Sequence, residues 1–509
     1  MHPAGSSAPA SGGLLSARWV VPIVLMALHF MVAVPLILRG TMTGRWGEDQ
    51  INYHEPAVRI FAQELPRPNL RDYHSATTPG YHLIVAATSR LLGDSTATLQ
   101  LIGSVFTAVL LGTLGAAVML RHRASEIDRG SLTSRPCSAS SRMAMVISLA
   151  VCLPLVCSMY VFQAGVWLLP DNAGWLGVLL VMLVSLRFRA GLGALAAGSA
   201  ALVALVLFRQ IHIWAAGLLW VGAWLSVMDS PRKSESIREL LTYPSLRLRR
   251  TMGAVAATLP AFVILYIFYT MWGGLTPREF QGQYKGFNPA APAFILAVLG
   301  VVSVFFIGFI AGGLWLLVTR KRVLLGTAIG IGLILALVPK TSFSVADGRF
   351  SGLWKIAEKL PLVAHHTAPG IVVLAVLGSI MAAAWFVSLP WRERWFFLAA
   401  LCGFTAAQSA SFQIWQRYTE PFILMLLALL SSGVRGVQVA TDDAPERAAD
   451  DARVPGVVFN TMPLLRVAGP VLLAFCLVTL AYVTMRNAPR ANLFESSNLP
   501  PGPSSGPSR

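Results

Sequence analysis

Long apolar runs alternate with short polar connectors along most of this chain. The runs are near the length of about 20 residues that an α-helix needs to cross the hydrocarbon core of a bilayer. The pattern therefore predicts an all-α polytopic membrane protein with about 13 transmembrane helices. The predicted spans are 19–38, 97–120, 143–162, 173–188, 190–208, 212–228, 251–272, 293–318, 323–340, 369–390, 395–412, 420–434 and 466–485.

The composition agrees with this pattern. Hydrophobic residues make up 55% of the 509 residues and charged residues only 12%, with a mean hydropathy of +0.64. Soluble domains carry about 25% charged residues, so an ordinary soluble protein is excluded. The net charge of +17 does not indicate a nucleic-acid partner. The basic residues gather instead in the connectors between apolar runs, where membrane topology explains them.

The distribution of lysine and arginine predicts which connectors face the cytoplasm. Basic connectors such as 320–322 mark that side by the positive-inside rule. The N-terminal tail 1–18 is then cytoplasmic, and residues 19–485 form one transmembrane domain. The tail 486–509, rich in Pro, Ser and Gly, is expected to be external and disordered.

The loop 39–96 after the first span is predicted to be external and is too long for a simple connector. Within it, 80–92 is apolar but too short to span, which predicts a helix lying on the membrane surface. Two adjacent acids, Glu48 and Asp49, follow the first span closely, and Asp72 comes later. A carboxylate just outside the hydrocarbon suits a general base, and the alternative is a solvated loop carboxylate without chemistry.

Three further polar patches are predicted on the same face. They are 208–214 with Arg209, Gln210, His212 and Trp214, 346–350 with Asp347 and Arg349, and 417–422 with Arg417 and Tyr418. Each patch has a simpler alternative: an arginine extending to lipid headgroups, an Asp–Arg pair closing a turn, or an aromatic belt at the interface. No arrangement of histidines indicates a metal site, because the neighbours His365 and His366 cannot easily share one ion.

Taken together, the patches bring carboxylates and guanidinium groups to one side of the membrane. This combination suits glycosyl transfer from a phosphate-activated lipid. A carboxylate base, Asp49 or Glu48, removes the proton of the acceptor hydroxyl, and guanidinium groups stabilise the departing phosphate. The candidate phosphate-binding residues are Arg209, Arg349 and Arg417, and the candidate substrate-binding residues are Asp72, Gln210, His212, Trp214, Asp347 and Tyr418.

The same patches resemble one family, the dolichyl-phosphate-glucose α-1,2-glucosyltransferases. The family's Asp-Glu-x-x-His patch is similar to 49–54, and its Thr-Thr-Pro-Pro-Gly-Leu-Tyr motif is similar to 77–81. Its Phe-Arg-Gln-Thr-Asn-Ile-x-Trp motif is similar to 208–214. Its Ala-Asp-Asn-Arg-His-Tyr patch is similar to 346–350, and its Arg-Tyr-x-x-Pro-Phe patch is similar to 417–422. The motifs follow one another in the same order along residues 45 to 425. The match at 208–214 is the most specific.

The resemblance implies the GT-C class of multi-helix membrane glycosyltransferases. In that class an acid in the first external loop is catalytic, which corresponds to Asp49, and a polyprenyl-phosphate sugar is the donor. No cofactor or metal is implied. The sequence departs from the family at Gln50, which stands where the second acid is expected, while Glu48 supplies an acid on the other side. His212 and Gly348 each replace an asparagine.

The expected function is transfer of a hexose, glucose by the resemblance, to a glycan or lipid-linked acceptor. The Ala-, Gly- and Arg-rich composition favours a bacterial inner membrane with the site facing the periplasm or exterior, or the endoplasmic reticulum in a eukaryote. The alternatives are a transporter or lipid-linked sugar flippase, and a catalytically inactive scaffold. A transporter would need polar groups at mid-membrane, where His29 is the clearest candidate.

Overall fold

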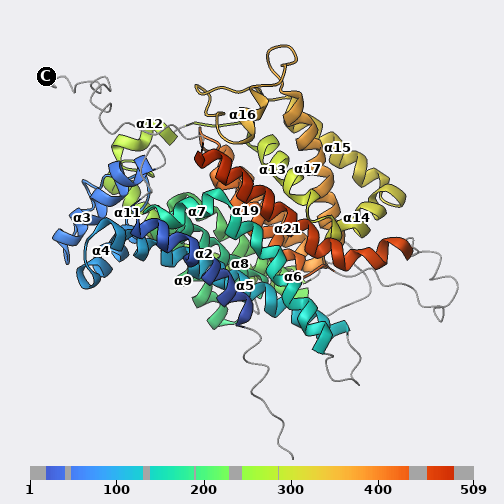
Figure 1. Cartoon of the computed structure of the whole chain (residues 1–509), viewed down its shortest axis with the longest axis horizontal. Coiled ribbons are helices and arrows are strands. Elements are labelled where there is room, and N and C mark those ends of the chain that lie inside the picture. Colours follow the sequence, from blue (N-terminus) through green and yellow to red (C-terminus); the bar gives the residue numbers. More distant parts are fainter. Residues whose placement is uncertain are drawn as a thin grey trace, which may run out of the picture.

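The computed structural model describes most of the chain as a bundle of helices (Figure 1). The described residues are 19–40, 47–129, 138–187, 191–228, 243–284, 286–434 and 456–486. The predicted N-terminal tail and all but the first residue of the predicted C-terminal tail lie outside them. Within the described ranges the chain is helical and contains no β-strand, which confirms the all-α prediction.

The longer helices, in chain order, account for the predicted apolar runs. They are α2 (Val20–Leu38), α5 (Thr96–Arg129), α6 (Ser138–Cys157), α7 (Met159–Val166), α8 (Asp171–Leu186), α9 (Leu192–Phe208), α10 (Ala216–Leu225), α11 (Pro244–Trp272), α13 (Ala291–Val304), α14 (Ile307–Thr319), α15 (Arg322–Leu337), α17 (Pro369–Ser388), α18 (Trp391–Ser409), α19 (Gln416–Ser431) and α21 (Gly456–Arg486). Short helices α12 (Gln281–Tyr284) and α16 (Leu353–Ala357) lie in connectors.

Five helices among the described residues are long and apolar enough to cross a membrane. Counting each bent pair of helices as one span raises the number to seven. These helices indicate an α-helical membrane protein, but they do not confirm thirteen spans. Four further apolar helices have only 10–17 residues. A rise of about 1.5 Å per residue makes them shorter than the hydrocarbon core, so their length alone does not identify them as spans.

The predicted span 293–318 is not one straight helix. Helices α13 and α14 meet at Phe305 and Phe306 with a bend of 110°. A second predicted span, 143–162, is divided at Ser158, where α6 and α7 differ in direction by 66°. Hydropathy reports how apolar a run is and carries no information about its direction, which is why both bends escaped prediction.

Helices α13 and α17 form a close contact at the side of the bundle that also carries α14 and α15 (Figure 1). Glycines allow the approach: a Cβ added at Gly378 would overlap the carbonyl oxygen of Leu296, and one at Gly300 would lie 2.8 Å from the Gly378 nitrogen. Small residues at such crossings let backbones pack directly, as is common between helices in membranes.

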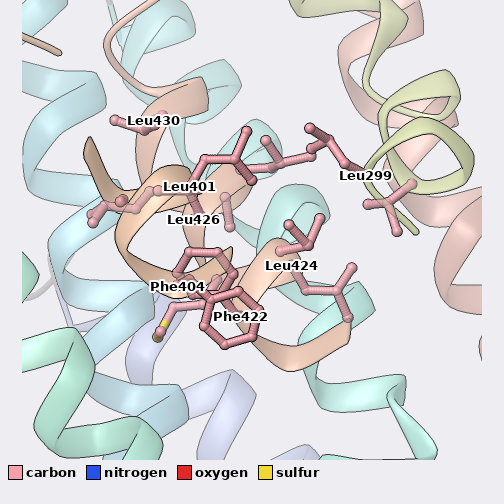
Figure 2. Packing of buried hydrophobic residues seen from close by; sticks show 14 of the residues in the cluster. Leu299, Leu401, Phe404, Phe422, Leu424, Leu426 and Leu430 are labelled. Carbon is pink, nitrogen blue, oxygen red and sulfur yellow. The ribbon is translucent and has the colours of Figure 1, made fainter. Parts of the chain in front are cut away.

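The centre of the bundle is a continuous apolar core. Figure 2 shows part of it, where Phe404 of α18 stacks on Phe422 of α19 with ring centroids 4.0 Å apart. Leucines of α13, α18 and α19 surround the pair. The side chains of α19 are buried from Tyr418 to Ser431, so this helix is the interior element that carries the last polar patch into the bundle.

The first long loop has its own structure, as predicted. It contains α3 (Glu55–Glu64) and α4 (Gly80–Leu92), which lie together at one edge of the molecule (Figure 1). The bounds of α4 match the helix predicted over 80–92. A separate apolar cluster holds the loop against the bundle, with Phe61 and Tyr73 stacked and Trp272 of α11 packed beside them.

Candidate functional site

The two adjacent acids of the first loop have different surroundings. Glu48 is exposed, whereas the side chain of Asp49 is 42% exposed and contacts another segment of the chain. Asp49 comes directly before a single π-helical turn, Gln50–His54, which runs into α3. Pro56 at the start of α3 has no N–H to donate, which weakens the ordinary helical bonding just before it. Wide turns of this kind occur often at functional sites.

A network of polar side chains fixes this π-helical turn. Gln50 donates from Nε2 to Glu55 at 2.9 Å, and its Oε1 accepts from Gln100 Nε2 at 2.9 Å. Arg59 and Thr96 bind the other oxygen of Glu55 at 2.7 and 2.6 Å. Gln50, which replaces the second acid of the resembled motif, therefore has a structural role, because it holds in place the turn that follows Asp49.

Asp49 forms an ion pair with an arginine from the far end of the chain. Its Oδ2 lies 3.1 Å from Nη1 of Arg417, which is at the start of α19. Arg417 donates from Nη2 to the Tyr418 hydroxyl at 3.0 Å. Arg417 Nε is buried and has no hydrogen-bond partner among the described residues. A donor left unpaired in a buried place is available to a bound anion.

A second ion pair lies deeper in the molecule. Arg209 follows the end of α9 with an extended backbone, and its Nη1 contacts Oδ1 of Asp171 in the first turn of α8. The side chain of Arg209 is 8% exposed and that of Asp171 is 9% exposed. The helix packing depends on Gly174, where an added Cβ would lie 3.3 Å from Arg209 Cβ. The absence of a side chain there lets Arg209 reach Asp171.

Tyr418 joins the two pairs. The guanidinium carbon of Arg209 lies 4.6 Å from the centre of the Tyr418 ring, and that of Arg417 lies 5.1 Å from it. Two cations on one aromatic ring are each stabilised by its negative face. Asp49, Asp171, Arg209, Arg417 and Tyr418 are called the carboxylate–guanidinium cluster below.

The cluster is assembled from four distant segments of the chain. They are the first loop, the beginning of α8, the end of α9 and the beginning of α19. His212 lies beside it: its ring centre is 4.6 Å from that of Trp175, and its buried Nδ1 has no partner among the described residues. The site thus combines two guanidinium groups and two carboxylates with buried polar atoms that a ligand could bind.

Gln210 and Trp214, both predicted to bind substrate, make contacts that hold the fold together. Gln210 accepts from the Thr78 backbone N–H at 3.0 Å and donates to the carbonyls of Ala76 and Leu275 at 2.8 and 3.0 Å. It ties the first loop to the end of α11. The Trp214 ring packs edge-on against Phe404 and Phe422 of the core.

Asp347 and Arg349 pair with each other and not with the cluster. Arg349 donates from Nη2 to Asp347 at 2.8 Å and from Nε to the Ser342 carbonyl at 2.8 Å. The turn between them needs Gly348, whose φ is +69° and whose added Cβ would overlap the Phe412 carbonyl oxygen. Asparagine, which stands at this place in the resembled motif, also tolerates positive φ, so glycine here is compatible with the same turn.

Asp72 likewise lies apart from the cluster. It is exposed and accepts a hydrogen bond from the Asn69 side-chain amide at 2.8 Å. Among the sequence-predicted residues, the structure therefore brings together Asp49, Arg209, Arg417 and Tyr418, with His212 beside them. Within the described part of the chain, no group of three or more His, Cys, Asp and Glu side chains is arranged to hold a metal ion.

Sequence reasoning missed several polar residues near the cluster. Asp171 is one of them, although an acid directly after a proline and before an apolar run is unusual in a chain with 23 acids. The hydrogen-bonded residues His54, His82 and Tyr73 were also missed as a unit, because only the fold brings them together. Burial lowers the pKa of His54 to about 4, with nearby charges of both signs contributing less.

The chain matches no protein-family model, no curated protein and no solved structure. Assignment of a function therefore depends on the geometry of the cluster and on the motif resemblance.

Proposed function

We propose that this protein is a membrane glycosyltransferase of the GT-C type, with more spans than the five to seven that length and composition identify. It would transfer a hexose, glucose by the resemblance, from a polyprenyl-phosphate donor to a glycan or lipid-linked acceptor on the non-cytoplasmic face. The observation that carries the proposal is the carboxylate–guanidinium cluster. Four segments that the sequence separates widely meet there, and three of them carry motifs that resemble the family.

The cluster suits a phosphate leaving group. Arg209 and Arg417 share the Tyr418 ring, and Arg417 Nε has no partner among the described residues. Guanidinium groups bind phosphate through paired N–H donors and stay charged throughout the physiological pH range. Two of them held in place can stabilise the negative charge that develops as the phosphate departs.

Asp49 is the proposed general base. The Asp49 carboxylate accepts a hydrogen bond from Arg417 Nη1 at 3.1 Å. A donor phosphate at Arg417 would compete for that guanidinium and leave the carboxylate free to accept a hydrogen bond from the acceptor hydroxyl. The hydroxyl oxygen then attacks the anomeric carbon, its proton passes to Asp49, and the bond from the anomeric carbon to the phosphate oxygen breaks. The polyprenyl phosphate leaves with the bonding electrons, and a β-linked donor gives an α-linked product.

The acceptor would approach the same π-helical turn. An open cavity of about 460 Å³ borders it, and its polar lining includes Gln50, Glu55, Arg59 and Gln100, with Trp167 as an aromatic surface. A few polar groups with an aromatic surface are typical of a site for a small polar ligand. This cavity supports an acceptor with sugar hydroxyls.

The proposal is tested with purified protein in lipid nanodiscs, a radiolabelled polyprenyl-phosphate glucose and a panel of glycan and lipid-linked acceptors. We expect a labelled product that carries an α-linked hexose. A panel with no product, together with movement of labelled donor across liposome membranes, would support the flippase alternative. The transporter candidate His29 gives that alternative no support, because its Nε2 is bonded to Ser104 at 2.8 Å and the residue is buried.

A further inference from the structure

Two histidines and a tyrosine form a buried hydrogen-bonded chain beside the cluster. Tyr73 Oη lies 2.6 Å from His82 Nδ1, and His82 Nε2 lies 2.9 Å from His54 Nδ1. All three residues are buried. They come from the first loop, from α4 and from the π-helical turn that follows Asp49. The chain therefore links the body of the loop to the residue that ends this turn.

The distances determine which group donates in each hydrogen bond of this series. The Tyr73 hydroxyl could donate to His82 at 2.6 Å, or to Thr77 Oγ1 or the Thr78 carbonyl at 3.5 Å each. A separation of 3.5 Å is at the limit of a hydrogen bond, so the proton belongs on the bond to His82. Burial raises the pKa of Tyr73, so this hydroxyl keeps its proton.

The direction of the first bond fixes the hydrogen positions in both rings. Burial keeps both histidines neutral, lowering the pKa of His54 to about 4 and that of His82 well below its usual range. A neutral imidazole has one N–H and one acceptor nitrogen. Since His82 accepts at Nδ1, its hydrogen is on Nε2, which donates to His54 Nδ1. The hydrogen of His54 is then on Nε2.

His54 Nε2 is available to a ligand at the cluster. Its ring belongs to the single turn that begins directly after Asp49, and Asp49 pairs with Arg417 at 3.1 Å. The charges of Asp171 and Arg209 also act on the ring. Its hydrogen bond to another side chain is made through Nδ1, and no described residue bonds to Nε2. A neutral N–H here adds a directional donor to the two charged arginines.

We propose that Tyr73 and His82 fix the tautomer of His54, so that His54 Nε2–H is a third donor to the phosphate group bound at the cluster. The inference rests on the proposed function only in taking the phosphate to be that of a lipid-linked sugar. Tyr73 and His82 act through His54 and are positioning residues. The arginines supply charge, and His54 orients one phosphate oxygen.

The tautomers can be measured without any enzymatic assay. Full-length protein labelled with ¹⁵N-histidine, in nanodiscs, is studied by NMR with and without farnesyl phosphate as the probe. His54→Asn and His82→Asn variants assign the two signals among the nine histidines. We expect both rings to carry hydrogen on Nε2, and the His54 Nε2–H signal to shift when farnesyl phosphate is added. Hydrogen on His54 Nδ1, or a signal that farnesyl phosphate leaves unmoved, would overturn the proposal.

Variants distinguish an effect of these hydrogen bonds on phosphate binding from their contribution to folding. Tyr73→Phe removes the donor that sets the direction, so we expect mixed tautomers at His54 and a weaker affinity for farnesyl phosphate. His54→Asn should weaken that affinity about 10- to 100-fold, the range for one lost hydrogen bond to an anion. His54→Gln should recover most of the loss, because its amide nitrogen occupies the place of Nε2. Equal losses in His54→Asn and His54→Gln would contradict the inference.

Matched controls lie in the same loop. His74 pairs with Glu279 at 2.7 Å, and Tyr53 packs edge-on against Phe280. Neither residue takes part in the hydrogen bonds that join Tyr73, His82 and His54. His74→Asn and Tyr53→Phe should leave the His54 tautomer and the affinity for farnesyl phosphate unchanged. Failure of the proposed function would be distinguishable: wild-type protein would then bind farnesyl phosphate through His54 but transfer no hexose. Hexose transfer with an unperturbed His54 signal would reject the inference alone.

Discussion

The molecule contains acid–arginine pairs of two kinds, which differ in what is needed to form them. Asp347 and Arg349 are two residues apart, and a glycine turn is enough to bring them together. Asp49 and Arg417 are 368 residues apart, and they meet only when the whole bundle has folded. Both pairs lie in patches that the sequence marks as candidates, and of these two pairs the long-range one is joined to a second arginine and a second acid.

Burial distinguishes the second ion pair of the cluster from both of these. The side chains of Asp347 and Asp49 are 55% and 42% exposed, whereas those of Asp171 and Arg209 are 9% and 8% exposed. Holding charges out of water is costly unless they are paired, so a buried ionic cluster is seldom retained for stability alone. A local pair that closes a turn has a sufficient structural explanation. We therefore propose that the chemistry occurs at the cluster and that the Asp347–Arg349 turn is structural.

The largest expected effect separates the two acids of the first loop. Asp49→Asn should lower the rate of hexose transfer about 10²- to 10⁴-fold, since it removes the proposed base. Glu48→Gln is the matched control and should stay within about threefold of wild type, because Glu48 is exposed. The two rates are measured with the labelled donor in nanodiscs. If Glu48→Gln lowered the transfer rate and Asp49→Asn did not, Glu48 and not Asp49 would be the base.

The arginines provide the next comparison. Arg417→Lys keeps a charge but loses the paired donors, so we expect a roughly 10- to 10³-fold fall in kcat/KM. Arg349→Lys makes the corresponding change at the turn and should alter kcat/KM by less than about threefold. Steady-state kinetics with varied donor concentration measure both. Equal losses would mean that the turn also contacts the donor.

Stability should respond differently to loss of each acid. Asp171→Asn removes a buried carboxylate from beside the buried guanidinium of Arg209, which should cost about 3–5 kcal/mol. Asp347→Asn also leaves a buried arginine, but the carboxylate that it removes is 55% exposed, so water can take its place beside Arg349 and the cost should be smaller, about 1 kcal/mol. Thermal unfolding in detergent, followed by tryptophan fluorescence, measures the change. Similar melting temperatures for the two variants would contradict the difference in burial.

A substitution at Gly348 tests whether the Asp347–Arg349 turn needs a glycine. Gly348→Ala combines a positive φ with a contact to the Phe412 carbonyl, and should cost about 1–3 kcal/mol. Gly217→Ala in α10 meets no atom within 4 Å and should be neutral or slightly stabilising. Both are read from the same unfolding curves. An unchanged melting temperature for Gly348→Ala would show that the loop relaxes freely.

The last comparison is the pH dependence of stability. The pKa of His54 is about 4 in the folded protein and near 6.5 in the unfolded chain, so the unfolded state binds more protons between these values. Stability should therefore fall as the pH is lowered from 6.5 towards 4, by at most about 1.4 kcal/mol per pH unit from this residue. His54→Asn should reduce the slope. Asp347→Asn should leave it unchanged, because hydrogen bonding by Ser344 and the nearby Arg349 hold the pKa of Asp347 below its usual range.

Some features could be predicted from the sequence because they are local. The helix over 80–92 follows from an apolar run bounded by Pro79 and Gly93, and the observed α4 has the same bounds. The sequence predicts Arg209 at the end of an apolar run, where α9 does end. The Asp347–Arg349 turn is one of the alternatives that the sequence offers, and its glycine makes it recognisable.

Other features depend on tertiary contacts and left no local signal. The 110° bend between α13 and α14 lies within an unbroken apolar run, and neither proline nor glycine occurs between Val304 and Ile307. Asp171 belongs to the cluster because α8 and α9 pack closely at Gly174, which no pattern in the sequence indicates. The histidine chain joins residues 28 positions apart through a loop whose path the sequence does not specify.

The most direct test of the central claim is a structure of the protein in nanodiscs with a non-transferable polyprenyl-phosphate glucose analogue. We predict that the phosphate contacts Arg417 and Arg209, and that the anomeric carbon faces the side of the π-helical turn next to Asp49. A phosphate bound at Arg349, or an analogue held away from both arginines of the cluster, would contradict the account.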